Sequence, residues 1–238
     1  MESGGKRTGD LSSLATYRAL ERHRALGRYR TRLILGMSAT KGGHDVIEFD
    51  SEINAALSGD GPIPRARVLA WIDAVADSDL STLSKLYRLT GEGYYRIQPE
   101  LGREPTCALI QRYLLGCIRD GVTENDEIQE RYEAAETLHV WFRHLAAMDG
   151  TTGTSVVLTA AANGLMKLYL ESGEDIRVAI ETGFLEHALE TAALRPYFEQ
   201  WGSDPRLEPA WKRALEWGDA HPDYMAGLFQ RVQGKIKE

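Results

Sequence analysis

The sequence has few cysteines and no long hydrophobic run. Of its 238 residues only two are cysteine, Cys107 and Cys117. On a single predicted helix they would lie about 15 Å apart along the axis, too far apart for a disulfide bond. No apolar stretch reaches the roughly 20 residues that cross a bilayer, and the first residues lack the apolar segment of a secretory signal. We therefore expect a cytoplasmic protein with two buried, reduced thiols.

Recognised catalytic and nucleic-acid-binding motifs are also missing. There is no G-x-S-x-G sequence of a hydrolase nucleophile, and no zinc-finger, RRM or KH signature. The six histidines stand next to no recognisable catalytic partner. We expect no cofactor, and a non-enzymatic role is favoured over an enzymatic one, although distant residues can assemble a site without a motif.

What the chain does have is helical periodicity. Apolar residues recur at helical spacing through most of the sequence, and strand-like alternation is nearly absent. Helices are predicted over 11–37, 51–58, 64–77, 79–90, 106–119, 126–148, 154–172, 175–182, 184–193, 208–218 and 222–236. An extended piece is expected at 46–49 and a loop at 90–105. Short helices with short polar turns predict an all-α fold, an irregular α-solenoid-like stack of about ten helices.

One segment, residues 158–190, resembles an armadillo-type repeat. The apolar positions that carry the resemblance are Ala161, Leu165, Leu168, Ile176, Ile180, Leu185 and Leu189. In that family the glycine at the position of Gly183 permits a sharp turn into a further helix. The stretch "EPTCALIQRYLLGCIRDGV" is similar to one helix of a HEAT-like pair. The resemblance implies an armadillo/HEAT-like stack of helix pairs.

The same segment departs from the armadillo pattern where function would lie. Asn163 stands where peptide-binding members carry tryptophan. Lys167 stands where they carry the asparagine that clamps the peptide backbone. The resemblance therefore implies the helix packing and not the peptide clamp of that family.

The charge of the chain is unevenly distributed. Residues 1–43 carry a net charge of +6, although the whole chain carries −7, so residues 44–238 carry −13. Five of the six arginines of the first predicted helix fall on one face, opposite Leu20, Leu26 and Leu33, and Arg30 lies on the apolar side. We expect a basic amphipathic N-terminal helix in 1–43 and an acidic helical body in 44–238, with a minor boundary near 58–64.

Three roles are open for the basic helix. Its arginines can pair with the acidic body of the chain. They can bind nucleic acid or another acidic partner through phosphate-type contacts. The helix can also lie on anionic lipid, but its apolar side has no tryptophan or phenylalanine anchor.

Two predicted helices each offer a carboxylate and an imidazole. Glu136 and His139 are three residues apart in "ETLH", and His187 and Glu190 are three apart in reverse order in "EHALE". Paired motifs of this kind build carboxylate-bridged di-metal sites in helix bundles. Such a site needs further carboxylates, and His139 falls beside the apolar stripe of its helix. A hydrogen-bonded histidine is favoured over a metal ligand.

The leading functional hypothesis is a non-enzymatic adaptor that binds another protein, of open identity, through a stacked-helix surface. Tyrosine and arginine are common anchors at such interfaces. The contact candidates are Arg18, Arg22, Arg28 and Arg32 of the basic helix and Tyr94, Tyr95, Arg96 and Arg103 of the predicted loop. The alternatives are a nucleic-acid-associated regulator that uses the same basic helix, and a metal-dependent enzyme.

Overall fold

The computed structural model describes residues 44–121, 128–147 and 154–221. The predicted basic helix of 1–43, with its four candidate arginines, and the helix predicted over 222–236 lie outside the described residues. The chain divides into two compact units, Met1–Ile47 and Glu48–Glu238. Apart from the start of the first helix, every described element belongs to the second unit.

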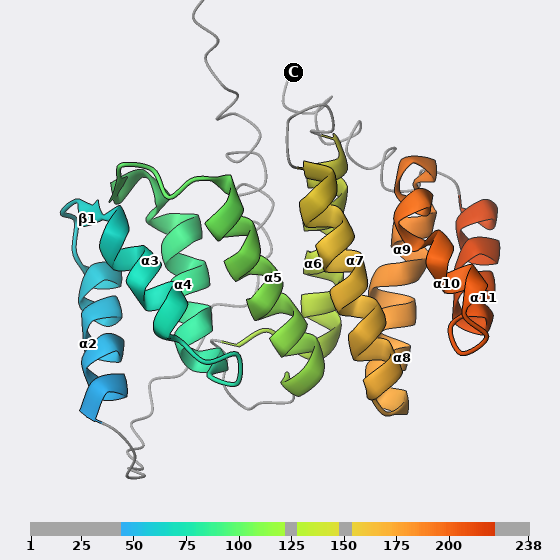
Figure 1. The fold of residues 1–238 in the computed structure, drawn as a ribbon, viewed down its shortest axis with the longest axis horizontal. Coiled ribbons are helices and arrows are strands. Elements are labelled where there is room, and N and C mark those ends of the chain that lie inside the picture. Colours follow the sequence, from blue (N-terminus) through green and yellow to red (C-terminus); the bar gives the residue numbers. More distant parts are fainter. Residues whose placement is uncertain (1–43, 122–127, 148–153, 222–238) are drawn as a thin grey trace, which may run out of the picture. The chain divides into compact units, whose positions relative to one another are not determined.

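The described residues are mostly helical, which confirms the all-α prediction. The helices are α2 His44–Ser58, α3 Arg65–Ala74, α4 Leu80–Glu92, α5 Arg103–Asp120, α6 Arg131–Ala147, α7 Thr154–Glu171, α8 Glu174–Ile180, α9 Glu186–Leu189, α10 Glu199–Ser203 and α11 Glu208–Ala220 (Figure 1). Shorter helical segments are the 3-10 turns η1 Tyr94–Arg96 and η3 Ala192–Phe198 and the π-helical η2 Glu181–Leu185. Two-residue strands, β1 Ile63–Pro64 and β2 Ile97–Gln98, pair in parallel. Within these ranges no helix is both long and apolar enough to cross a membrane.

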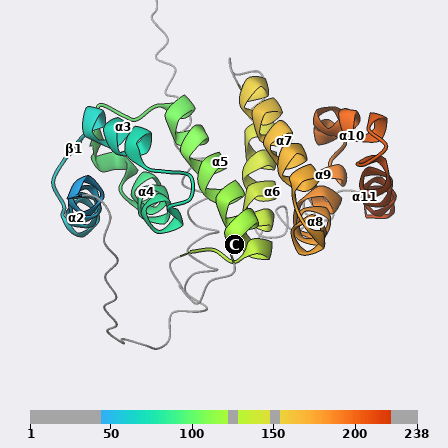
Figure 2. The ribbon, with the colours of Figure 1, turned by 60° about the horizontal axis from the view of Figure 1, so that its bottom comes forward.

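Helices of the second unit pack mainly on neighbours in the chain, as two views of the ribbon show (Figures 1 and 2). α5 contacts α4 on one side and α6 on the other, and α6 also contacts α7, α8 and η2. One continuous hydrophobic core follows this series, from Ile53 of α2 to Ala214 of α11. At its centre, the buried Phe142 ring of α6 lies 5.4–5.6 Å from the rings of Phe184, Tyr197 and Phe198. Aromatic burial therefore joins α6 to the elements that follow α8.

Two predicted irregular segments are wrong. Residues 46–49, expected to be extended, belong to α2, which begins at His44. The segment 90–105 is shorter as a loop than expected, because α4 continues to Glu92 and α5 begins at Arg103. Between α4 and α5 the chain forms η1, and Ile97 then pairs with Ile63.

The turn expected at Gly183 is absent, since α8, η2 and α9 form one uninterrupted helical run over 174–189. Gly183 lies instead against α6, where an added Cβ would come within 2.9 Å of the Ala135 Cβ. The glycine thus permits close helix approach rather than a turn. Gly183 lies within the π-helical η2, whose hydrogen bonds span five residues instead of four, a feature often found at functional sites.

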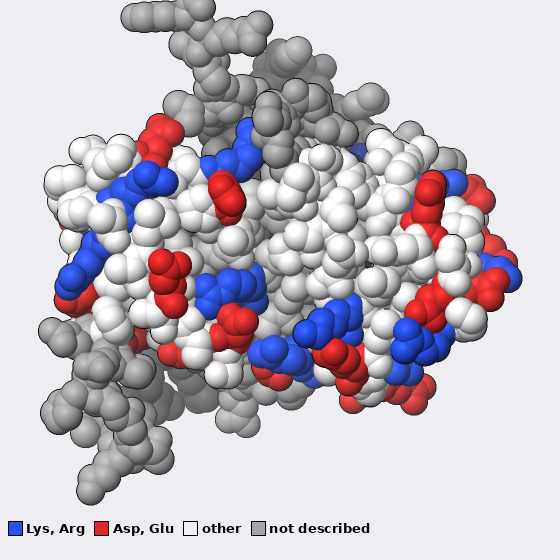
Figure 3. All heavy atoms as spheres, viewed as in Figure 1, with Lys and Arg blue, Asp and Glu red and all other residues white. Residues whose placement is uncertain are grey.

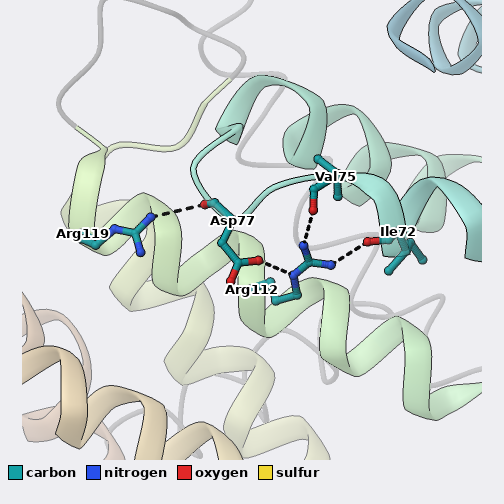
Figure 4. Close-up of polar contacts among 5 residues, drawn as sticks. All are labelled: Ile72, Val75, Asp77, Arg112 and Arg119. Carbon is teal, nitrogen blue, oxygen red and sulfur yellow. Dashed lines mark hydrogen bonds and ion pairs between the residues drawn. The ribbon is translucent and has the colours of Figure 1, made fainter. Parts of the chain in front are cut away.

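Arginine side chains donate hydrogen bonds to the last carbonyls of several helices. Arg112 of α5 donates to the carbonyls of Ile72 and Val75 at 2.8 and 2.7 Å and to the Asp77 carboxylate at 2.7 Å. Arg119, which also belongs to α5, donates to the Asp77 carbonyl (Figure 4). The last carbonyls of a helix have no partner within it, so a guanidinium supplied by a neighbouring helix satisfies them.

The same device recurs along the chain. Arg131 donates to the carbonyls of Ile118 and Arg119 at the end of α5. Arg177 of α8 donates to the carbonyls of residues 169 and 170 near the end of α7, and Arg195 of η3 to that of Leu189 at the end of α9. These guanidinium groups hold consecutive helices together. Their donors are used in hydrogen bonds to carbonyls of the protein itself.

Replacing Arg112 by alanine is expected to lower the free energy of unfolding by about 1–2 kcal/mol, because two helix-end carbonyls and one carboxylate lose their donor. Urea unfolding followed by circular dichroism measures the loss. Arg206→Ala removes an exposed arginine that pairs with Asp204 and is the matched control. An equal midpoint for the Arg112 and Arg206 variants would show that the α3–α5 contact contributes nothing.

Candidate functional site

The four contact candidates of the segment 90–105 differ in their exposure to solvent. Tyr95 is 72% exposed and Arg103 is exposed at the start of α5. Tyr94 is half-buried against the core. Arg96 is buried, and its Nε donates to the Gly61 carbonyl at 3.0 Å. Arg96 is therefore not accessible to a partner as a contact residue would be, because its side chain holds the loop between α2 and β1.

Three of the four metal candidates are brought together. The rings of His139 in α6 and His187 in α9 have centroids 5.6 Å apart. His187 Nδ1 lies 3.0 Å from Glu190 Oε1, and the Trp217 indole of α11 donates to the same oxygen at 3.2 Å. We call His139, His187, Glu190 and Trp217 the imidazole cluster. Glu136, half-buried, lies one turn before His139 on α6.

His139 is the most deeply buried titratable group of the cluster. It is 2% exposed, and its Nε2 has no hydrogen-bond partner. Burial, together with the charges of His187 and Arg143, lowers the pKa of His139 to about 3. The imidazole is therefore neutral at physiological pH.

Two further carboxylates, Glu181 of η2 and Glu186 of α9, belong to the helical run that carries His187. Glu181 accepts from the Tyr169 hydroxyl and from Arg213 Nη2, both at 2.6 Å. Burial raises the pKa of Glu186, with Glu181 and Glu190 adding to the rise and His187 and Arg213 opposing it. Two of these carboxylates, Glu181 and Glu190, bind side chains of α11, so the row joins α11 to the rest of the fold.

The cluster does not form a metal centre. Among the described residues no group of three or more His, Cys, Asp or Glu is placed to hold a metal ion. The Glu190 carboxylate orients the His187 ring, an arrangement that general-base catalysis uses. Here the same oxygen also binds the Trp217 indole, so the pair has a structural task in holding α11.

The two thiols are buried and free, as the sequence predicts. Burial raises the pKa of Cys107 to about 11 and that of Cys117 to about 12. A thiol attacks and binds metals as the thiolate. Both cysteines are therefore protonated, unreactive parts of the core.

An exposed surface without charge, which the sequence interpretation did not identify, lies on α7. Its members are Ser155, Val156, Thr159, Ala160 and Asn163, which we call the neutral α7 face. Val156 is 71% exposed. The space-filling view shows a broad uncharged area over α5 and α7, bordered by charged side chains (Figure 3).

The neutral α7 face is fixed from both sides by amide side chains. Gln111 of α5 donates to the Ala160 carbonyl at 3.2 Å. Gln200 of α10 donates to the Asn163 side-chain oxygen at 2.8 Å. Neutral hydrogen bonds therefore connect the face to both neighbouring elements without bringing charge onto it.

The chain matches no family model, and no curated protein or solved structure is similar to it at a significant level. The armadillo-type resemblance of residues 158–190 stays a prediction. The exposed surface and the buried clusters are thus the basis for assigning a function.

Proposed function

We propose that this chain is a non-enzymatic adaptor whose helices form an irregular α-solenoid and whose neutral α7 face binds another protein. The observation that carries the proposal is the exposure of Val156, 71% accessible, within a row of uncharged exposed residues. Large apolar side chains with uncharged neighbours are typical of the centre of protein interfaces, whereas charge is depleted there.

The composition of the chain strengthens this reading of the neutral α7 face. Charged residues make up 26% of the sequence, yet α7 has none from Thr154 to Met166. Lys167 and Glu171, exposed in the later turns of α7, supply a charged rim. An uncharged centre with a charged rim favours a protein partner of matching, uncharged surface.

Four arginines of the described body favour the protein partner over nucleic acid. A phosphate-binding surface needs guanidinium groups that are free to contact the backbone of the nucleic acid. Arg112, Arg131, Arg177 and Arg195 donate to carbonyls of the protein itself. The candidate arginines of 1–43 remain predicted contacts of either partner.

A charge placed in the neutral α7 face should weaken the interaction. Val156→Arg would bury an unpaired guanidinium at the interface, and we expect at least about a tenfold loss of affinity. Tagged full-length wild type and variant are used to recover stoichiometric partners, which are identified by mass spectrometry. The affinity of each partner is then measured with purified components.

Val178→Arg is the matched control, since Val178 of α8 is also an exposed valine, 40% accessible. The control should bind like wild type. Equal binding by the Val156 variant would remove the neutral α7 face from the proposal. A loss with Tyr95→Ala instead would transfer the contact to the segment before α5.

A further inference from the structure

The cover over His139 comes from the helical run that follows α8. Phe184 of η2 meets the imidazole edge-on, with ring centroids 6.3 Å apart. The His187 ring of α9 lies against it at 5.6 Å. These two side chains, together with the surrounding core, leave His139 only 2% exposed. Movement of η2 and α9 away from α6 would therefore expose the imidazole to solvent.

The closed arrangement suits a neutral imidazole and not a charged one. An imidazolium donates a hydrogen bond from both ring nitrogens. The buried Nε2 has no acceptor in the closed arrangement. A buried charge without a partner is strongly unfavourable, so proton uptake by His139 requires that its cover open.

The charges around His139 do not compensate for the missing acceptor. His187 of α9 and Arg143 on the same helix both oppose a positive charge there. The Glu190 carboxylate already binds His187 and Trp217. Glu186 acts on His187 from the start of α9, and Glu136 lies one turn earlier on α6. None of the described groups on α5, α7, α8 or η3 is among those that shift the pKa of His139.

Opening of η2 and α9 would also release α11. Trp217 is bound to Glu190, and Arg213 is bound to Glu181. Asp219 pairs with Arg195 of η3 at 2.8 Å. Every one of these contacts ends on a residue between η2 and η3, so α11 is attached through the same segment that covers His139.

We propose that the segment Glu181–Ala220, from η2 to α11, is an acid-sensitive latch that protonation of His139 opens. At neutral pH the uncharged ring permits the closed packing. As the pH falls, the open segment exposes His139, which takes up a proton and cannot be covered again in the charged form. Acid therefore detaches α9 from α6, and α11 together with α9, before it unfolds α3 to α5.

The direction and size of the effect follow from proton linkage. The pKa of His139 is about 3 when closed, and an exposed histidine has a pKa of about 6.5. The open state binds the proton more tightly, so opening is favoured as pH falls from about 6.5 towards 3. Between pH 7 and pH 5 the opening equilibrium should rise about 25-fold.

Hydrogen exchange of the full-length protein at pH 7 and pH 5, corrected for the intrinsic exchange rate, tests the proposal. In wild type, amides of α9 and α11 should lose about 25-fold protection at pH 5, while α4 and α5 keep theirs. His139→Phe, which cannot titrate and enters an aromatic core, should abolish the pH-dependent loss. His139→Gln gives the same test through a polar, non-titrating side chain.

His221→Gln is the control, because it removes an exposed imidazole just outside the latch but leaves His139 and its cover in place. This variant should retain most of the pH-dependent loss. The proposal is overturned if either His139 variant keeps the wild-type response. It is equally overturned if α4 and α5 lose protection together with α9 and α11, since acid would then unfold the second unit as a whole.

Discussion

Replacing Phe142 by alanine should lower the free energy of unfolding by about 3–5 kcal/mol. Phe142 is fully buried. Its ring contacts Phe184 of η2 and both Tyr197 and Phe198 of η3. Truncation leaves a cavity where α6 meets these elements, and the rigid neighbouring rings fill it poorly.

Thermal and urea unfolding followed by circular dichroism measure this effect. Phe142→Leu keeps most of the apolar volume and should lose about half as much or less. Tyr95→Ala removes an aromatic ring that is 72% exposed, and it should change stability by less than about 0.5 kcal/mol. Equal losses from the Phe142 and Tyr95 alanine variants would contradict the central position of the aromatic cluster.

Helical periodicity was sufficient to predict most of the helices, because a local apolar pattern reports on burial within one helix. It failed where distant contacts decide the local structure. Ile97 pairs with Ile63, 34 positions earlier, and Arg96 is buried because it donates to the Gly61 carbonyl. A sequence window around 90–105 contains neither partner, so it indicates an exposed loop.

Three of the four residues of the imidazole cluster were identified from the sequence, but their geometry was not. Spacing of three residues identified His187 and Glu190 as neighbours on one helix face. The hydrogen bond from Trp217 to Glu190 comes from a residue 27 positions further along the chain. That contact makes Glu190 an attachment point for α11, which no local spacing could indicate.

The neutral α7 face was missed for a different reason. Because the first thirteen residues of α7 are all uncharged, its sequence looks similar on every side of the helix. Buried Ala161 and Ala162 are indistinguishable by residue type from exposed Ala160. Only the packing of α5, α6 and η3 on α7 determines which side remains exposed.

Replacing Gly218 by alanine should reverse the usual effect of that substitution. In an exposed helix alanine is more stable than glycine by about 1 kcal/mol. At Gly218 of α11 an added Cβ would lie 2.5 Å from the Leu189 carbonyl oxygen and 2.9 Å from the Glu190 backbone nitrogen. Backbone atoms cannot turn aside as a flexible side chain can. We expect a loss of about 2–3 kcal/mol as α11 is forced away from α9.

Gly91 of α4 is the matched control, because nothing lies within 4 Å of a Cβ added there. Gly91→Ala should stabilise the protein by up to about 1 kcal/mol, so the two alanine variants should shift the unfolding midpoint in opposite directions. Displacement of α11 would also break the bond between Trp217 and Glu190 and change the tryptophan fluorescence of the Gly218 variant alone. If both variants are more stable than wild type, α11 does not approach the α9 backbone this closely. The attachment of α11 through Glu190 would then be contradicted as well.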